Sequence, residues 1–322
     1  MPTPPGEFEL IARYFRRPAP HAVLGIGDDC ALLACEPGLQ WAVSTDMLVE
    51  GRHFLAGAEP RQLGHKALAV NLSDLAAMGA QPRAFTLALA LPTADPQWLQ
   101  AFSSGMLALA DASGIELVGG DTTRGPLNLC LTVLGLVPPE LALRRDAARA
   151  GDALWVSGTP GDARLALGHL RGEWQLSPAQ AQVVLPRLHA PQPRVGLGLA
   201  LRGVAHAAID ISDGLLGDLG HVLRASGVGA VVDADSIPAS PALAAVATAR
   251  RRACQLAGGD DYELLFTAPA HRHAKILQAA ERARVPVARI GSIVAEPGLQ
   301  LRDSAGRSIA EHYPSFDHFA AS

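Results

Sequence analysis

Aspartate residues recur beside glycine or serine at the ends of short apolar segments along the whole chain. Six segments share this character: 27–29, 44–46, 71–74, 119–121, 210–214 and 258–261. Folds that alternate strands and helices build their sites at strand ends and in the loops beyond them. The pattern therefore predicts an α/β chain whose acidic turns gather at a functional site.

Helical and strand patterns alternate along the chain, as expected for an α/β or α+β architecture. We expect helices at 8–15, 62–78 and 96–113, a helix after residue 161 and another from residue 214. Strands are expected at 41–44, 84–91, 115–118, 127–137, 153–157, 207–211, 228–232, 263–267 and 287–294. Segment 138–151 resembles a linker, so we place the domain boundary near residue 148, which gives domains 1–148 and 149–322.

Composition narrows the class of protein. The 322 residues carry a net charge of -4, with acids and bases spread along the chain, which argues against nucleic-acid or membrane partners. The first ten residues are Pro-rich and acidic, unlike a signal peptide. The four cysteines form no C-x-x-C pair, and thiols of this kind are typical of a reducing compartment. We expect a cytoplasmic protein.

Carboxylates in glycine-rich turns suit hard cations such as Mg²⁺, which shares its ligand shell with phosphates. Converging acidic turns would repel one another unless cations intervened. Taken singly, each acid has a simpler interpretation. Asp74 and Asp213 could be helix N-caps, Asp28 could be solvated, and residues 119–121 could form an ordinary turn.

Several familiar motifs are missing from the sequence. It contains no G-x-x-x-x-G-K-[ST] loop, no G-x-G-x-x-G after a strand, no G-x-S-x-G elbow and no H-E-x-x-H. These absences argue against a P-loop kinase, a dinucleotide-binding fold, a serine hydrolase and a zinc protease. The histidines are scattered, and His53, close after Asp46, is the one with a plausible role.

The motifs taken in order resemble the thiamine-monophosphate kinase family, within the aminoimidazole-ribonucleotide-synthetase-like superfamily. The resemblance covers nearly the whole chain and rests on segments 6–12, 25–33, 44–46, 53–54, 66–80, 119–125, 209–215, 258–264 and 316–319. Blocks 66–80 and 119–125 are the most specific to this family.

The resemblance implies a two-domain aminoimidazole-ribonucleotide-synthetase-like fold, a homodimer that pairs its N-terminal sheets, and ATP with several Mg²⁺ ions bound between the domains. The implied metal ligands are Asp29, Ser44, Thr45, Asp46, Asp74, Asp121, Asp210 and Asp213. The implied ATP contacts are Gly120, Asp121, Arg145 and Ser212. The implied contacts to thiamine monophosphate are His53, Asp260 and Phe316.

The implied reaction is transfer of the ATP γ-phosphate to thiamine monophosphate. The acceptor phosphate has a second pKa of about 6, so near neutrality it is already ionised and needs no dedicated general base. We therefore expect direct in-line transfer. Two alternatives stay open: another ATP-dependent enzyme of the superfamily, and a divalent-metal-binding structural module. Arg145 could also be a solvated linker residue, and Phe316 could anchor the tail.

Overall fold

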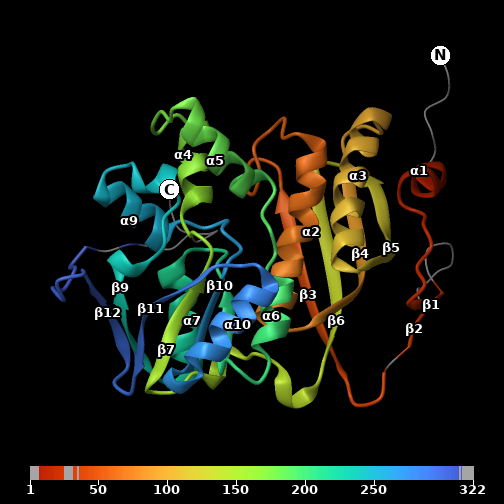
Figure 1. The fold of residues 1–322 in the computed structure, drawn as a ribbon. Helices are drawn as coiled ribbons and strands as arrows, with labels where there is room; N and C mark the ends of the chain where they lie inside the picture. The colour runs from red at the N-terminus through yellow and green to blue at the C-terminus, as the bar shows by residue number, and fades with distance from the viewer. Residues whose placement is uncertain (1–6, 25–31, 35, 312, 314–322) are drawn as a thin grey trace. The chain divides into compact units, whose positions relative to one another are not determined.

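The computed structural model describes the chain except for residues 1–6, 25–31, 35, 312 and 314–322 (Figure 1). Its internal contacts divide the chain into two compact units. The first comprises residues 1–75 and 80–140, and the second comprises residues 76–79 and 141–322. The domain boundary expected near residue 148 stays a prediction.

The first unit is built on a four-stranded sheet with strand order β3-β6-β4-β5. Strand β6 pairs antiparallel with β3 and β4, whereas β4 and β5 run parallel. A short antiparallel pair, β1 and β2, lies apart from this sheet. The elements are α1 (Glu7–Tyr14), β1 (Ala22–Leu24), β2 (Leu32–Leu33), β3 (Gln40–Val49), α2 (Pro60–Ala77), β4 (Gln81–Leu91), α3 (Pro96–Ser113), β5 (Glu116–Arg124) and β6 (Asn128–Val137).

Helices α2 and α3 lie side by side over one face of this sheet (Figure 1). Alternate residues of β4, from Phe85 to Leu91, are buried, as expected when one face of a strand is covered. Asp95 begins α3 by accepting a hydrogen bond from the Gln97 amide at 2.9 Å, and Gly114 ends it with φ 64°. Local caps and strand alternation thus define this layer.

The opposite face of the sheet is open in the described chain. Val43 and Met47 on β3 have exposed fractions of 60% and 53%, unusually high for large apolar side chains. Strand β3 is also an edge strand. An edge strand with exposed apolar residues is a surface on which further protein can pack.

Two glycines set the spacing between α2 and α3. A Cβ atom at Gly64 would lie 2.0 Å from the Phe102 carbonyl oxygen, and one at Gly105 would lie 1.9 Å from the Arg61 carbonyl oxygen. Backbone atoms cannot move aside as a flexible side chain can. The two helices can therefore approach this closely only because these positions lack side chains.

We expect Gly64→Ala to lower the free energy of unfolding by about 1–3 kcal/mol, because the added methyl group forces the two helix backbones apart. Gly196→Ala is the matched control: this glycine is also helical, but its added Cβ would meet only Ala283, at 3.9 Å. The control should keep or gain stability, since alanine is about 1 kcal/mol more favourable than glycine in a helix. Urea denaturation of the three proteins measures this. Equal stability of Gly64→Ala and wild type would contradict it.

The second unit is built on a six-stranded sheet with strand order β12-β9-β11-β7-β10-β8. All neighbours are antiparallel except β12 and β9. The strands are β7 (Asp152–Ser157), β8 (Ala207–Asp210), β9 (Gly229–Asp233), β10 (Leu264–Pro269), β11 (Val287–Val294) and β12 (Gly298–Arg302). The helices are α4 (Asp162–Leu170), α5 (Pro178–His189), α6 (Val195–Leu201), α7 (Leu215–Ser226), α8 (Pro241–Ala244), α9 (Thr248–Ala257) and α10 (His273–Ala283).

Both faces of this second sheet are covered. Leu154 and Val156 of β7 pack with the α7 side, whereas Ala153 and Trp155 pack with α6 and α10. Every residue of β7 is buried, which is typical of a strand between two layers. A third cluster joins α4, α5, α8 and α9.

Most expected elements are present, but several bounds differ. Strand β3 extends to Val49 rather than ending at Ser44, and β5 extends to Arg124 rather than ending at Val118. Segment 138–151 contains two short 3₁₀ helices, Pro139–Leu141 and Arg145–Ala147. Helices α5, α6, α8, α9 and α10 and strands β1, β2 and β12 were not predicted.

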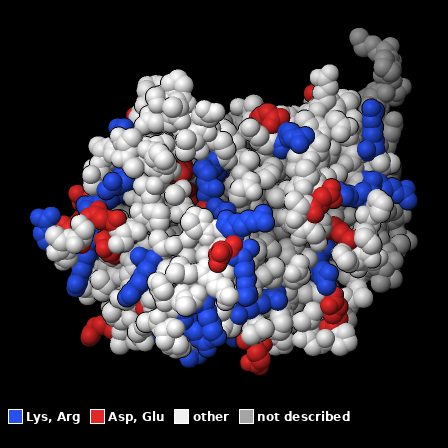
Figure 2. All heavy atoms as spheres, in the orientation of Figure 1, with Lys and Arg blue, Asp and Glu red and all other residues white. Residues whose placement is uncertain are grey.

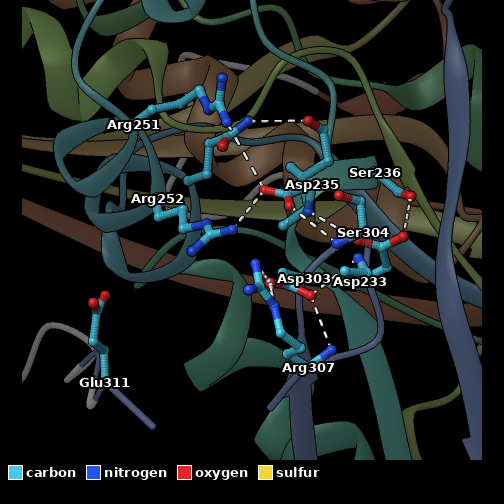
Figure 3. A network of polar contacts seen from close by, with 12 residues as sticks. Asp233, Asp235, Ser236, Arg251, Arg252, Asp303, Ser304, Arg307 and Glu311 are labelled. Carbon is cyan, nitrogen blue, oxygen red and sulfur yellow. Dashed lines mark hydrogen bonds and ion pairs between the residues drawn. The ribbon is translucent and has the colours of Figure 1, made fainter. Parts of the chain in front are cut away.

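A polar network fastens the segment after β12 to the body of the second unit (Figure 3). The Asp235 carboxylate accepts from Arg252 Nη2 at 2.8 Å and from the Ser304 amide at 3.0 Å. The Arg252 hydrogen bond holds the pKa of Asp235 below its usual range. Asp303 closes the adjacent turn by accepting from the amide and side chain of Arg307 at 2.9 Å.

Charged side chains are spread over the face of the molecule shown in Figure 2. Lys and Arg are intermixed there with Asp and Glu, and uncharged residues cover most of that face. In the part of the chain that the structure describes, no helix is both long enough and apolar enough to cross a membrane. The expectation that neither nucleic acid nor membrane is a partner stays a prediction.

Candidate active site

In the first unit, hydrogen bonds between β3 and α2 involve three predicted metal ligands, Ser44, Asp46 and Asp74. Ser44 and Asp46 alternate along β3, so their side chains share one face of the sheet. Ser44 Oγ donates to Asp74 Oδ2 at 2.5 Å, and the Asp46 amide donates to Asn71 Oδ1 at 3.1 Å. Asn71 and Asp74 are three residues apart on α2 and so face the strand together. All three predicted ligands are half-buried.

Asp74 lies far inside α2, so the interpretation of Asp74 as an N-cap is wrong. The helix begins at Pro60, and Glu59 accepts from the amides of Arg61 and Gln62 at 3.0 and 2.8 Å. Glu59 is therefore the residue that caps α2. The Asp74 carboxylate faces β3 and is free of any capping role.

Two further predicted residues, Thr45 and His53, make hydrogen bonds elsewhere in the first unit. Thr45 Oγ1 hydrogen-bonds Thr132 Oγ1 at 2.8 Å on the open face of the sheet, opposite to Ser44 and Asp46. His53 Nδ1 accepts from the Val49 amide at 3.0 Å. A neutral His53 therefore carries its proton on Nε2, where it can donate a hydrogen bond.

Gly120 and Asp121 lie within β5, so the interpretation of residues 119–121 as an ordinary turn is wrong. Gly120 has φ 148°, and a Cβ atom there would lie 1.9 Å from the Leu87 carbonyl oxygen. Asp121 pairs with Ala88, in the same row of the sheet as Met47. Asp121 is exposed on the open face, about 14 Å from β3 across three strand spacings.

In the second unit, the structure brings two predicted loops together. Asp210 ends β8, and the loop that follows it runs beside the loop that precedes β10. The ladder continues past the strands: Ile211 donates to the Glu263 carbonyl, Tyr262 donates to the Ile211 carbonyl and Asp260 donates to the Ser212 carbonyl, each at 2.9 Å. Ser212, Asp213 and Asp260 thus belong to adjoining loops, with Asp210 buried at their base.

Asp218 is a residue that sequence reasoning missed. Its Oδ2 accepts from the amides of Ser212, Asp213 and Gly214 at 3.1, 3.2 and 3.1 Å. Burial, reinforced by the nearby Asp213 carboxylate, raises the pKa of Asp218 to about 7. A carboxylate in the first turn, four residues after a glycine, was the available signal.

This geometry also excludes Asp213 as the cap of α7. The N-cap of α7 is Gly214, which has φ 123°, and Asp218 holds the three amides before the helix. The interpretation of Asp213 as an N-cap is therefore wrong.

The remaining predicted residues divide into two groups. Arg145 lies in a 3₁₀ helix of the second unit, where its carbonyl accepts from Ser226 Oγ at 2.8 Å and its side chain is exposed. Asp29 and Phe316 lie outside the described residues. Searched over the described residues, the structure holds no group of three or more His, Cys, Asp or Glu arranged to bind a metal.

Comparison with protein families identifies the two domains of this chain. Residues 27–137 match the AIR synthase related protein, N-terminal domain, and residues 149–304 match the corresponding C-terminal domain. The fold, a mixed α/β pair of such domains, is the one predicted from the sequence, and that prediction is confirmed.

Individual relatives give the family. The chain is 46% identical to the thiamine-monophosphate kinase of Salmonella typhimurium and 45% identical to that of Escherichia coli K12, over 98% of each chain in both cases. The crystal structure of thiamine-monophosphate kinase from Stenotrophomonas maltophilia is 49% identical with a TM-score of 0.84, over 88% of this chain and 91% of that one. AaThiL complexed with AMPPCP and TMP is 27% identical with a TM-score of 0.77, over 89% of both chains. The chain belongs to the thiamine-monophosphate kinase family.

Asp218 provides a test of the loop architecture. Asp218→Ala should lower the free energy of unfolding by about 2–4 kcal/mol, because three amides lose their acceptor. Asp218→Asn is the matched control: it keeps an acceptor oxygen and resembles the neutral form that a pKa of about 7 already populates at neutral pH. We expect the control to lose less than half as much stability in urea denaturation at pH 7. Equal losses in both variants would show that the hydrogen bonds are not the cause.

Proposed function

We propose that this protein transfers the terminal phosphoryl group of ATP to thiamine monophosphate, giving thiamine diphosphate and ADP. The observation that carries this proposal is the similarity to thiamine-monophosphate kinases along 98% of the chain. The complex of AaThiL with AMPPCP and TMP supports a site that accepts both substrates. The cytoplasmic location expected from the cysteines stays a prediction.

We propose several Mg²⁺ ions as cofactors, held in the first unit by Ser44, Asp46 and Asp74. Their oxygen ligands fit Mg²⁺, which typically takes one or two carboxylates and completes its shell with water and phosphate. Bound Mg²⁺ would neutralise charge on the two anionic substrates. The Thr45 side chain lies on the opposite face, so its proposed role falls to its main-chain oxygen.

We also propose metal ligands and an ATP contact in the second unit. Asp210 and Asp213 are proposed metal ligands, and Ser212, between them, is a proposed ATP contact. The three amide hydrogen bonds to Asp218 fix this short loop, which supports a binding role. Arg145 is a proposed ATP contact through its exposed guanidinium. Asp29 is a further proposed metal ligand.

His53 supports a reaction without a dedicated general base. Its Nδ1 is engaged by the Val49 amide, which leaves a proton on Nε2 of the neutral ring. With its proton on Nε2, the ring is better suited to donate a hydrogen bond to a substrate oxygen than to accept a proton from the substrate. We propose that His53 binds thiamine monophosphate and that the acceptor phosphate attacks ATP directly.

We propose a homodimer that pairs the open faces of the N-terminal sheets. Exposed Val43 and Met47 on edge strand β3 support this face as the interface. Asp121 lies on the same face, about 14 Å across the sheet from β3, too far to share one ion with Asp74 of its own chain. Gly120 and Asp121 are proposed ATP contacts at that surface, and Asp121 is also a proposed metal ligand.

The substrate test is a coupled assay of ADP release. We expect release to depend on thiamine monophosphate and to be nearly absent with free thiamine, because a metal-rich acidic site is suited to a phosphate. Omitting Mg²⁺ should abolish it. Turnover of free thiamine at a comparable rate would contradict the proposed acceptor.

Asp74→Asn tests the metal group. The asparagine can still accept from Ser44 Oγ but lacks the charge, so we expect kcat to fall at least about a hundredfold at ordinary Mg²⁺ with little change in Tm. Asp95→Asn is the matched control, since this acid of the same unit caps α3 and asparagine caps equally well. It should keep wild-type kcat. A near-native rate for Asp74→Asn would remove Asp74 from the proposed ligands.

A further inference from the structure

The loop before β10 has an unusual backbone. Asp260 and Tyr262 have φ of 68° and 51°, and among the described residues other than glycine only Arg284 shares this left-handed conformation. Arg284 ends α10, where such a conformation is common. For a bulky residue such as tyrosine it costs about 1–3 kcal/mol and persists only where the surroundings impose it. Strain of this kind clusters at functional sites.

Main-chain contacts hold one side of this loop. Asp260 and Tyr262 donate their amides to the carbonyls of Ser212 and Ile211, each at 2.9 Å. Between them, the buried Asp261 accepts from the Gly161 amide at 2.7 Å, at the start of α4. The Asp261 side chain is thus tied to α4, whereas Asp260 and Tyr262 contact each other.

A buried carboxylate holds the other side. Glu263 is fully buried and accepts from Arg194 Nε at 2.6 Å, from Ser157 Oγ at 2.5 Å and from the guanidinium of Arg187. A Cβ atom at Gly158 would lie 2.0 Å from Glu263 Oε1, so this glycine makes room for the carboxylate. These contacts therefore hold Glu263, the residue that directly follows Tyr262, in place.

The product of these constraints is one side-chain contact. Tyr262 Oη donates to Asp260 Oδ1 at 3.1 Å, across a spacing of two residues. Because the phenol binds one carboxylate oxygen, the direction of the second oxygen is fixed as well. The half-buried carboxylate is oriented before any ligand arrives.

We propose that Tyr262 is a positioning residue that orients Asp260 toward the organic part of the phosphate acceptor. This inference rests on the proposed function, in which Asp260 contacts thiamine monophosphate. The organic part of that molecule carries a positively charged ring and an amino group, and both suit an oriented carboxylate. The strained backbone at residues 260 and 262 keeps this orientation without help from the substrate.

The test is Tyr262→Phe, which removes the hydroxyl and keeps the ring. We expect KM for thiamine monophosphate to rise about tenfold, as for loss of a hydrogen bond to a charged group. The kcat, the KM for ATP and the Tm should stay within error, because the backbone contacts remain. Tyr313→Phe is the matched control: Tyr313 also donates to a carboxylate two residues earlier, that of Glu311. It should leave all four quantities unchanged.

A double-mutant cycle with Asp260→Ala identifies the path of the effect. If Tyr262 acts through Asp260, Tyr262→Phe should change nothing further in the Asp260→Ala background. Additive effects would overturn the proposal, as would a lowered Tm with unchanged KM. Calorimetric titration with thiamine monophosphate alone gives the same comparison without turnover. A wild type that binds this molecule but releases no ADP would refute the proposed function and leave the positioning role to be judged on affinity.

Discussion

The buried carboxylate of Glu263 is the interaction on which the second unit's loops depend. Arg187, Arg194 and Ser157 surround it, and the first two come from α5 and from the residue before α6. Removing one partner of such a buried group typically costs about 3–5 kcal/mol, because the remaining charge has no solvent. Since Glu263 lies beside the ladder to Ile211, the cluster also fixes the loop after β8. One buried group thereby connects helices, sheet and both acidic loops.

The sequence was a good guide to elements and to the residues of the loops. It predicted α2, α3, β6 and β11 closely, and it placed Asp210 in a strand with Ser212 and Asp213 in the loop that follows. The sequence ended β3 and β5 too early, so it could not predict which face of the sheet the side chains beyond those ends occupy. Stopping β5 at Val118 concealed that Asp121 continues the strand and points to the open face. The length of β5 is set by its pairing with β4, and the sequence shows β4 only as a separate segment.

Longer-range features were beyond the sequence for a different reason. Asp218 looks like any acid in a first helical turn, and only the folded loop shows three amides converging on it. Asp74 lies inside the helix expected at 62–78, so that expectation already argued against the cap interpretation. Glu59, the actual cap, precedes the proline that begins the helix. The partners of the buried Glu263 lie 69, 76 and 106 residues away from it along the chain.

The glycines beside the acids invite a reinterpretation. Glycine beside an acid can allow a bulky anion to approach the backbone closely. In the structure, the space beside Gly120 is filled by the Leu87 carbonyl, and the space beside Gly259 by the Ser212 carbonyl at 2.3 Å from a built Cβ. Packing of the protein against itself already requires glycine there. A glycine in an acidic motif is therefore evidence for close backbone packing first. The proposed Mg²⁺ and phosphate site of the first unit therefore depends on the oxygens of Ser44, Asp46 and Asp74 rather than on these glycines.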